Sequence, residues 1–163
     1  MLKLLKLTQD QRHHIYYLGV LDQPANFETP FKGRPYSCLL WATRSIDANQ
    51  RAQLADALVA SECRLACCGG IDAASWEQAI DLASIAYQDA GYSERFVPTT
   101  THASEDDATF YFVWCSDSDD DQFTKHLILI IGQEDATITR LFERVKKQVL
   151  AREGGEEHNT NVS

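Results

Sequence analysis

The sequence of 163 residues lacks any uncharged apolar stretch of the 18 or so residues that a membrane-spanning helix requires. It is also poor in basic side chains, with 15 Lys and Arg against 24 Asp and Glu, so its formal net charge is -9. A surplus of this sign repels phosphate backbones and anionic lipid headgroups at long range. We therefore expect neither nucleic acid nor membrane among its partners, whereas a basic protein partner suits the charge.

The amino terminus has only a partial likeness to a secretion signal. Lys3 and Lys6 stand among leucines, but residues 8–14 are polar and no small-residue cleavage site follows. The five cysteines are an odd number, and most lie in apolar runs, as is typical of reduced thiols packed as small hydrophobic groups. The sequence therefore predicts a cytoplasmic protein.

Four short apolar runs are each followed by a segment with helical periodicity. The runs are Tyr36 to Ala42, Cys63 to Cys68, Arg95 to Thr101 and His126 to Ile131. Strands that alternate with helices are typical of a parallel sheet covered by helices. The expected fold is therefore α/β, a three-layer Rossmann-like or flavodoxin-like sandwich with a mostly parallel sheet of four to five strands.

The same pattern predicts the domain organisation. Residues 1–35 are the least periodic part and form an N-terminal extension, in which residues 14–21 are apolar enough for an edge strand. Residues 36–152 form a single α/β domain. The polar residues 153–163 predict a flexible tail.

Two segments in the second half of the chain carry more specific signals. Pro98 cannot donate a ladder hydrogen bond, so its strand should lie at a sheet edge or end nearby. Residues 109–115 fit either a helix or a strand, because every position except the first is apolar. The capping pair Ser104 and Asp107 favours a short helix.

Parallel strands joined by right-handed crossovers bring their carboxyl ends to one edge of the sheet, where open α/β sheets bind ligands. The residues expected at this edge are Thr43, Arg44, Ser45, Cys67, Cys68, Gly69, Gly70, Asp72, Thr100, Thr101, His102, Glu105, Gly132, Gln133 and Glu134. This prediction locates a site and does not specify a reaction.

His102 is the best single candidate for a functional side chain. A neutral imidazole acts as a base toward a thiol such as Cys67 or Cys68, with Glu105 or Asp106 orienting the ring, as nucleophilic catalysis requires. The alternative is a loop histidine whose hydrogen bonds are satisfied locally. The spacing leaves both interpretations open.

Gly69 and Gly70 precede a predicted helix, and glycines let backbone N–H groups approach a phosphate. Arg44 is the one guanidinium expected beside them, and Thr101 lies on the same edge. However, the glycines match neither nucleotide-binding motif, and Asp72 adds a negative charge at the helix start. A tight turn followed by a capped helix is the other interpretation.

No metal and no cofactor are predicted. Cys67 and Cys68 are adjacent and alternate across a strand, which makes them a poor chelating pair. The aspartates of residues 116–122 imitate the start of a calcium loop, but Gln122 stands where that loop needs glycine. These aspartates are interpreted as a solvated acidic loop.

Part of the chain, about residues 35–132, carries a family likeness. The segments concerned are CRLACCGGIDAASWEQAIDLASIAY at 63–87, RFVPTTTH at 95–102 and FYFVW at 110–114. They resemble a family of small uncharacterised bacterial domains of unknown function, in which one strand ends in Trp-Gly and a later one in Thr-Thr-x-His. Here Cys68-Gly69 stands in place of Trp-Gly. The resemblance implies the βα alternation and supports His102, and it brings no assigned activity.

Three functions follow from these observations. The leading one is a non-catalytic cytosolic binding module, of immunity or regulatory type, that engages a protein partner through its acidic surface. The second is a small hydrolase or transferase with His102 and Cys67 or Cys68 at the sheet edge. The third is a sensor of a nucleotide-like ligand that uses Arg44 and the glycine pair.

Overall fold

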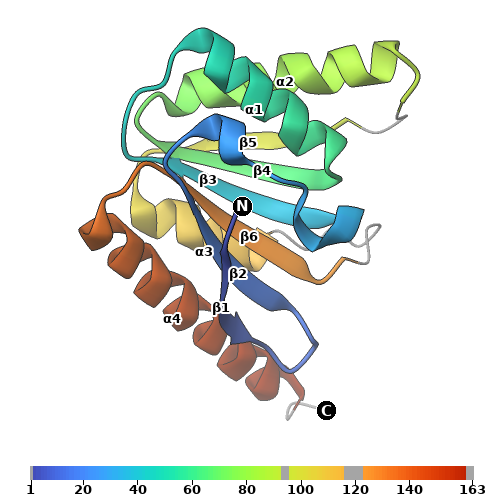
Figure 1. Ribbon diagram of the computed structural model, residues 1–163. Helices are drawn as coiled ribbons and strands as arrows, with labels where there is room; N and C mark the ends of the chain where they lie inside the picture. Colours follow the sequence, from blue (N-terminus) through green and yellow to red (C-terminus); the bar gives the residue numbers. More distant parts are fainter. Residues whose placement is uncertain (1, 93–95, 116–122, 161–163) are drawn as a thin grey trace.

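The structure is a computed structural model that describes residues 2–92, 96–115 and 123–160 (Figure 1). Its strands are β1 (Leu4–Gln9), β2 (Ile15–Leu21), β3 (Tyr36–Ala42), β4 (Cys63–Gly70), β5 (Thr99–His102) and β6 (Lys125–Ile131). Its helices are α1 (Ala48–Ala60), α2 (Ala73–Asp89), α3 (Glu105–Cys115) and α4 (Asp135–Thr160), with short 3-10 turns η1 (Pro24–Asn26) and η2 (Pro30–Gly33).

The six strands form one sheet in the order β1-β2-β6-β3-β4-β5. β1 pairs antiparallel with β2, and the other neighbouring pairs are parallel. The expected α/β class and the mostly parallel sheet are therefore confirmed, with six strands in place of the four to five expected.

The centre of the sheet explains the continuous apolar runs. β3 is buried at every position, and β6 is buried at every position except Lys125. Strands covered on both faces have this composition because neither side meets water. Neighbouring side chains point to opposite faces, so Leu39 and Leu40 pack in different core clusters.

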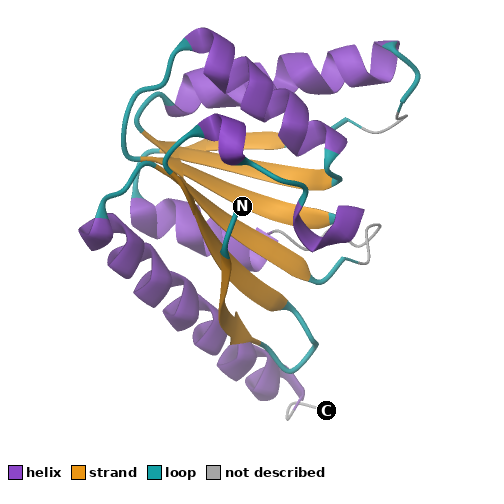
Figure 2. Cartoon of the chain, in the orientation of Figure 1, coloured by secondary structure: helices purple, strands orange, loops and turns teal. Residues whose placement is uncertain are grey.

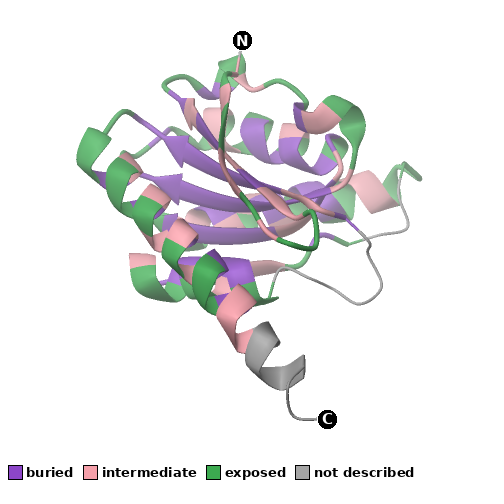
Figure 3. Cartoon of the chain, turned by 90° about the horizontal axis from the view of Figure 1, so that it is seen from below, coloured by how far each residue is buried: buried purple, intermediate pink, exposed green. Residues whose placement is uncertain are grey.

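Helices cover both faces of the sheet (Figures 1 and 2). α1 and α2 pack on one face, where Leu54 and Ile80 enter the core, and α3 and α4 pack on the other, where Phe112 and Leu141 do so. Figure 3 shows that the central strands are buried while the outer sides of the helices are exposed. No helix in the described part of the chain combines the length and the apolar character needed to cross a bilayer.

Two sequence signals in the second half of the chain are confirmed. The Ser104 hydroxyl accepts a hydrogen bond from the Asp107 N–H at 3.1 Å at the start of α3. Residues 109–115 therefore continue as a helix, as the cap favours. β5 lies at the edge of the sheet, as expected, but it begins only after Pro98, so residues 96–98 of the apolar run expected as a strand lie outside it.

The expectation that residues 14–21 form an edge strand is wrong. β2 lies between β1 and β6 and pairs with both, so the edge is β1 instead. β6 is the strand that covers the second edge of β2, and it is distant in the sequence, since Ile15 pairs with Lys125. Local composition carries no information on such a neighbour.

α4 runs through most of the segment 153–163 that the sequence predicted as a flexible tail. Two tertiary hydrogen bonds secure this part of the helix. The Arg152 guanidinium donates to the Val113 carbonyl at 2.7 Å, and the Glu153 carboxylate accepts from the Gln11 N–H at 3.0 Å. Contacts with α3 and with the loop before β2 therefore prolong the helix beyond its own apolar pattern.

The direction of the chain connections reverses between β3 and β6. β3 leads through α1 to β4 on one side, whereas β6 is reached from β5 through α3. α1 and α4 consequently leave this strand pair toward opposite faces (Figure 1). In open α/β sheets, ligands bind outside the carboxyl ends of the strands at such a reversal.

Candidate functional site

A pocket of about 520 Å³ opens at the carboxyl ends of the strands. Its lining comes from the ends of β3, β4 and β5 and from the first turns of the following helices. The lining residues are Trp41, Ala42, Thr43, Gly70, Ile71, Ala73, His102, Ala103, Glu105, Glu134, Thr137 and Arg140. The structure thus brings together Thr43, Gly70, His102, Glu105 and Glu134 from the set expected at this edge. Arg44, Gly69, Asp72, Thr101 and the cysteines do not line the pocket.

Gly69 and Gly70 form the end of β4 rather than the expected tight turn. A Cβ on Gly69 would overlap the Trp41 ring, which packs directly over the strand. Gly70 has a φ of +78°, and a Cβ there would overlap the Ala42 carbonyl, which accepts a hydrogen bond from the Ile71 N–H at 2.8 Å. The glycine pair is therefore required by close packing of β3 on β4, and its geometry does not favour a phosphate cradle.

Arg44 and Asp72 are engaged with other residues at this edge. The Arg44 guanidinium donates to the Asp22 carbonyl and lies 3.9 Å from the Asp22 carboxylate. Asp72 precedes α2 but makes no side-chain cap on it; its carboxylate accepts a hydrogen bond from the Ser45 hydroxyl at 2.7 Å. Thr101 is exposed on β5. Arg44 is therefore bound to Asp22 and lies outside the pocket lining.

His102 is held on both sides of its ring. The distance from Nδ1 to Asp107 Oδ2 is 2.7 Å, and that from Nε2 to Thr100 Oγ1 is 2.8 Å. Because the carboxylate only accepts, Nδ1–H donates to it, and in the neutral form of the ring Nε2 accepts the Thr100 hydroxyl proton. The side chain is 5% exposed and its ring packs against Tyr111. The orienting carboxylate is therefore Asp107, and not Glu105 or Asp106 as expected.

The cysteines do not fit the expected imidazole–thiol pair. Cys67 lies on the same face of the sheet as Thr100, and the Thr100 hydroxyl hydrogen-bonds to it. Burial raises the pKa of Cys67 to about 12, so its thiol carries its proton near neutral pH. Cys68 points to the opposite face, where burial raises its pKa well above the ordinary value. Thr100 thus occupies the place beside His102 that a nucleophilic thiol was expected to take.

Glu105 faces α4 rather than His102. It accepts hydrogen bonds from Arg140 at 2.9 to 3.1 Å and from Arg144 at 3.2 Å. These hydrogen bonds, chiefly those of Arg140, hold the pKa of the Glu105 carboxyl below its ordinary value. Arg144 also pairs with Asp106. The ion pairs join the start of α3 to α4 and form one wall of the pocket, and no local sequence signal indicated them.

Carboxylates gather around the pocket at the carboxyl edge. Those in the loops and first helical turns there are Asp22, Asp47, Asp72, Glu105, Asp106, Asp107, Glu134 and Asp135. The described basic side chains of this edge are Arg44, Arg51, Arg140 and Arg144. Acidic residues also stabilise the helix amino termini at which they lie. The carboxyl edge is therefore acidic, with most of its cations already paired.

Candidate metal ligands are sparse in the described part of the chain. There, no three His, Cys, Asp or Glu side chains are grouped so that they could hold a metal ion. All five cysteines are free thiols, four of them buried. The acidic loop at residues 116–122, considered above for calcium, lies outside the described residues.

One comparison with known proteins gives a match. A family model described as Domain of unknown function (DUF7684) matches residues 15–148, from the start of β2 to the third quarter of α4. No curated protein and no solved structure matches the chain.

Proposed function

The chain belongs to the family Domain of unknown function (DUF7684), and we propose that it is a non-catalytic binding module that engages a basic protein partner. The observation that carries the proposal is the pocket at the carboxyl edge with the surplus of carboxylates around it; within the lining, Arg140 is held by Glu105 and Glu134 is left as the exposed carboxylate. A Rossmann-like or flavodoxin-like layering is part of the proposal, because those folds take their ligands at this edge. Helices on both faces of the sheet support it (Figure 2).

The pocket suits a cationic side chain of the partner. Trp41 offers an aromatic ring, and Glu134 places an exposed carboxylate in the lining. An extended arginine or lysine side chain fits a volume of about 520 Å³. The surrounding carboxylates would steer a basic surface toward the pocket at low salt. An immunity or regulatory role, in a cytoplasmic setting, accords with such a module.

The test uses a fluorescent oligoarginine peptide as the probe and fluorescence anisotropy as the measurement. We expect binding that weakens steeply with salt and falls about tenfold in Glu134→Lys, because the pocket then repels the probe. The matched control is Asp89→Lys, which makes the same charge change at the far end of α2. Equal weakening in both variants, or no binding at low salt, would overturn the proposal.

A second function, that of a small hydrolase or transferase, is favoured by one observation. Thr100, His102 and Asp107 stand in the order hydroxyl, imidazole, carboxylate, with both hydrogen bonds at 2.7 to 2.8 Å. In that order the Thr100 oxygen would attack an acyl carbon, its proton would move to Nε2, and Nε2 would return it to the leaving group. In this reaction Thr100 is the nucleophile, whereas the sequence analysis expected Cys67 or Cys68 in that role.

The second function is tested with an activated ester and a covalent probe for hydroxyl nucleophiles. Wild-type protein should be acylated at Thr100, and Thr100→Val should abolish the labelling while preserving the shape of the side chain. Thr99→Val is the control, because that threonine bonds to Asp81 on the other face of the sheet. Labelling that persists in Thr100→Val would leave the binding module as the sole proposal.

A further inference from the structure

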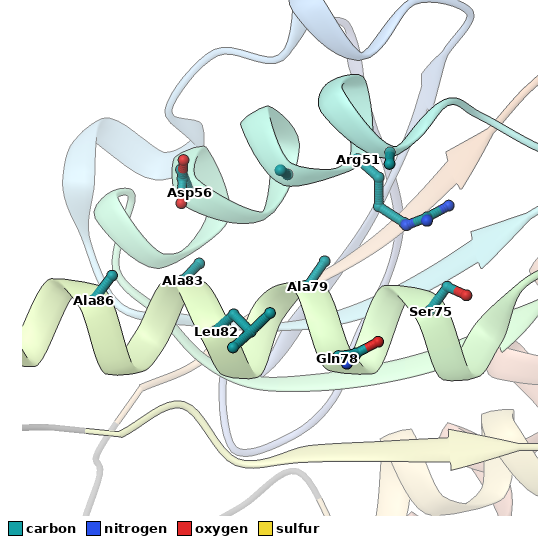
Figure 4. A pocket seen from close by; sticks show the side chains of 10 residues that line it. Arg51, Asp56, Ser75, Gln78, Ala79, Leu82, Ala83 and Ala86 are labelled. Atoms are coloured by element: carbon teal, nitrogen blue, oxygen red, sulfur yellow. The ribbon is translucent and has the colours of Figure 1, made fainter.

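An apolar groove runs between α1 and α2, on the face of the molecule that these two helices form (Figure 4). It has a volume of about 300 Å³ and continues into a second hollow of about 240 Å³, with which it shares Asp56, Ala83 and Ala86. Half of the residues that line the two hollows are alanines, namely Ala48, Ala52, Ala60, Ala79, Ala83, Ala86 and Ala90. Small side chains leave room in the groove for a larger side chain from outside.

Large apolar side chains are exposed on α2 and directly after its end. Leu82 lines the groove and is 60% exposed, and Tyr92 lines the second hollow and is 73% exposed. Ile85 is also exposed on α2, one turn from Leu82. Contiguous apolar surface of this kind is typical of a face that is covered by another protein surface.

The charges of the groove are arranged with opposite signs at its two ends. Figure 4 shows Arg51 near one end and Asp56 near the other, both on α1. These are the charged side chains that line the groove, so its lining is neutral although the chain carries a net charge of -9. A strongly basic or strongly acidic partner surface is not complementary in charge to this groove. A surface that carries one positive and one negative charge in the reverse order is complementary to it.

We propose that a second copy of this chain occupies the groove, related to the first by a two-fold axis through the middle of the groove. A two-fold axis places the Arg51 end of one copy over the Asp56 end of the other, and this pairing occurs twice. Leu82 of each copy then enters the alanine-lined groove of its partner, as a side-chain ridge packs into a groove between helices. The interface is therefore self-complementary in both shape and charge.

This homodimer is independent of the proposed binding function. The groove and the second hollow share no lining residue with the pocket at the carboxyl edge. The dimer thus leaves both copies of that pocket open to a partner.

The first experiment measures mass in solution by sedimentation velocity over a range of micromolar concentrations. Wild-type protein should sediment as a dimer, and Leu82→Glu should raise the dimer Kd at least about tenfold, because it buries a carboxylate in an apolar groove. Leu150→Glu on α4 is the matched control, since Leu150 is 66% exposed on a different helix. A monomeric wild type, or equal weakening in both variants, would overturn the proposal.

The second experiment tests the two-fold arrangement by exchanging charges. Arg51→Asp and Asp56→Arg should each weaken the homodimer, because each places like charges opposite one another at both ends of the groove. An equimolar mixture of the two variants should restore dimerisation as a heterodimer, in which every Asp meets an Arg. The double variant R51D/D56R should also dimerise.

Thermal unfolding of each variant provides the folding control, since Arg51 also donates to the Ile46 carbonyl at 3.1 Å. If the folded single variants dimerise as tightly as wild type, or if their mixture stays monomeric, the groove is not the two-fold interface.

Discussion

Two histidines occupy opposite ends of the same sheet and are held in opposite ways. His102, at the carboxyl edge, bonds to Asp107, whose side chain is 64% exposed, and lies beside an open pocket. His126, at the amino edge, is fully buried between Ser37 Oγ at 2.6 Å and His14 Nδ1 at 2.8 Å. The hydrogen-bonded group around His102 therefore reaches solvent through Asp107, whereas His126 lies entirely inside the core.

The surroundings of His126 explain why its charge is disfavoured. Its ring stacks on Tyr16 and packs against Phe112 and Phe123. Burial is the main cause that lowers the pKa of His126 well below its ordinary value, and His14 and Arg152 add to this effect. The amino edge therefore favours a neutral imidazole that completes a buried hydrogen-bond network, which is a structural role.

The comparison predicts that removal of His126 destabilises the protein most. His126→Ala leaves a cavity and removes the partner of the buried Ser37 hydroxyl, at a cost of about 3 to 5 kcal/mol in the free energy of unfolding. His102→Ala should cost less, because the carboxylate of Asp107 can turn to water. Urea unfolding of the two variants measures the difference. If both variants lose the same free energy of unfolding, the two histidines contribute equally to stability and the proposed difference between the two ends of the sheet is wrong.

The pH dependence of stability should follow His126. The unfolded chain takes up a proton near the ordinary pKa of 6.5, while the folded protein does so only at lower pH. Stability is therefore retained above that value and lost as the pH falls below it, by up to about 1.4 kcal/mol per pH unit.

Urea unfolding at several pH values between neutral and mildly acidic measures this slope. His126→Gln should flatten it, because the variant has no group at this position that takes up a proton in the unfolded chain. A slope that survives in His126→Gln would assign the effect to another group.

The ion pairs at the carboxyl edge should have the smallest effect. Glu105→Gln removes a carboxylate whose pKa is lowered by the hydrogen bonds of Arg140 and, less strongly, by Arg144. This contribution is present above the ordinary carboxyl pKa of 4.5 and is lost as the pH falls through the lowered value. Thermal unfolding at neutral pH should show a modest decrease for Glu105→Gln and none for Glu134→Gln. The two variants should converge in strong acid.

Much of the fold could be predicted from local patterns. The apolar run of β3, the edge position after Pro98 and the Ser104 cap of α3 each depend on residues close together in the chain. The rule that the carboxyl ends of parallel strands lie at one edge also predicted that His102 and Glu105 lie close together, and both line the same pocket.

The partners of the site residues could not be predicted in this way. His102 bonds to Asp107, and Glu105 to Arg140, because of how α3 docks on the sheet and on α4. Residue type identifies groups capable of such bonds, whereas the choice among several nearby carboxylates depends on side-chain direction. The interpretation of Asp106 and Glu105 as orienting groups failed for this reason.

The sequence by itself determined the alternation of the central strands with helices and the edge of the sheet at which polar residues gather, since these follow from periodicity and capping over a few positions. Only the tertiary structure decided that β2 is interior, that α4 extends past Arg152, and that His126 is enclosed by Ser37 and His14. Each of these features depends on contacts between residues far apart in the sequence. Such contacts stabilise the protein only after folding has brought the distant residues together.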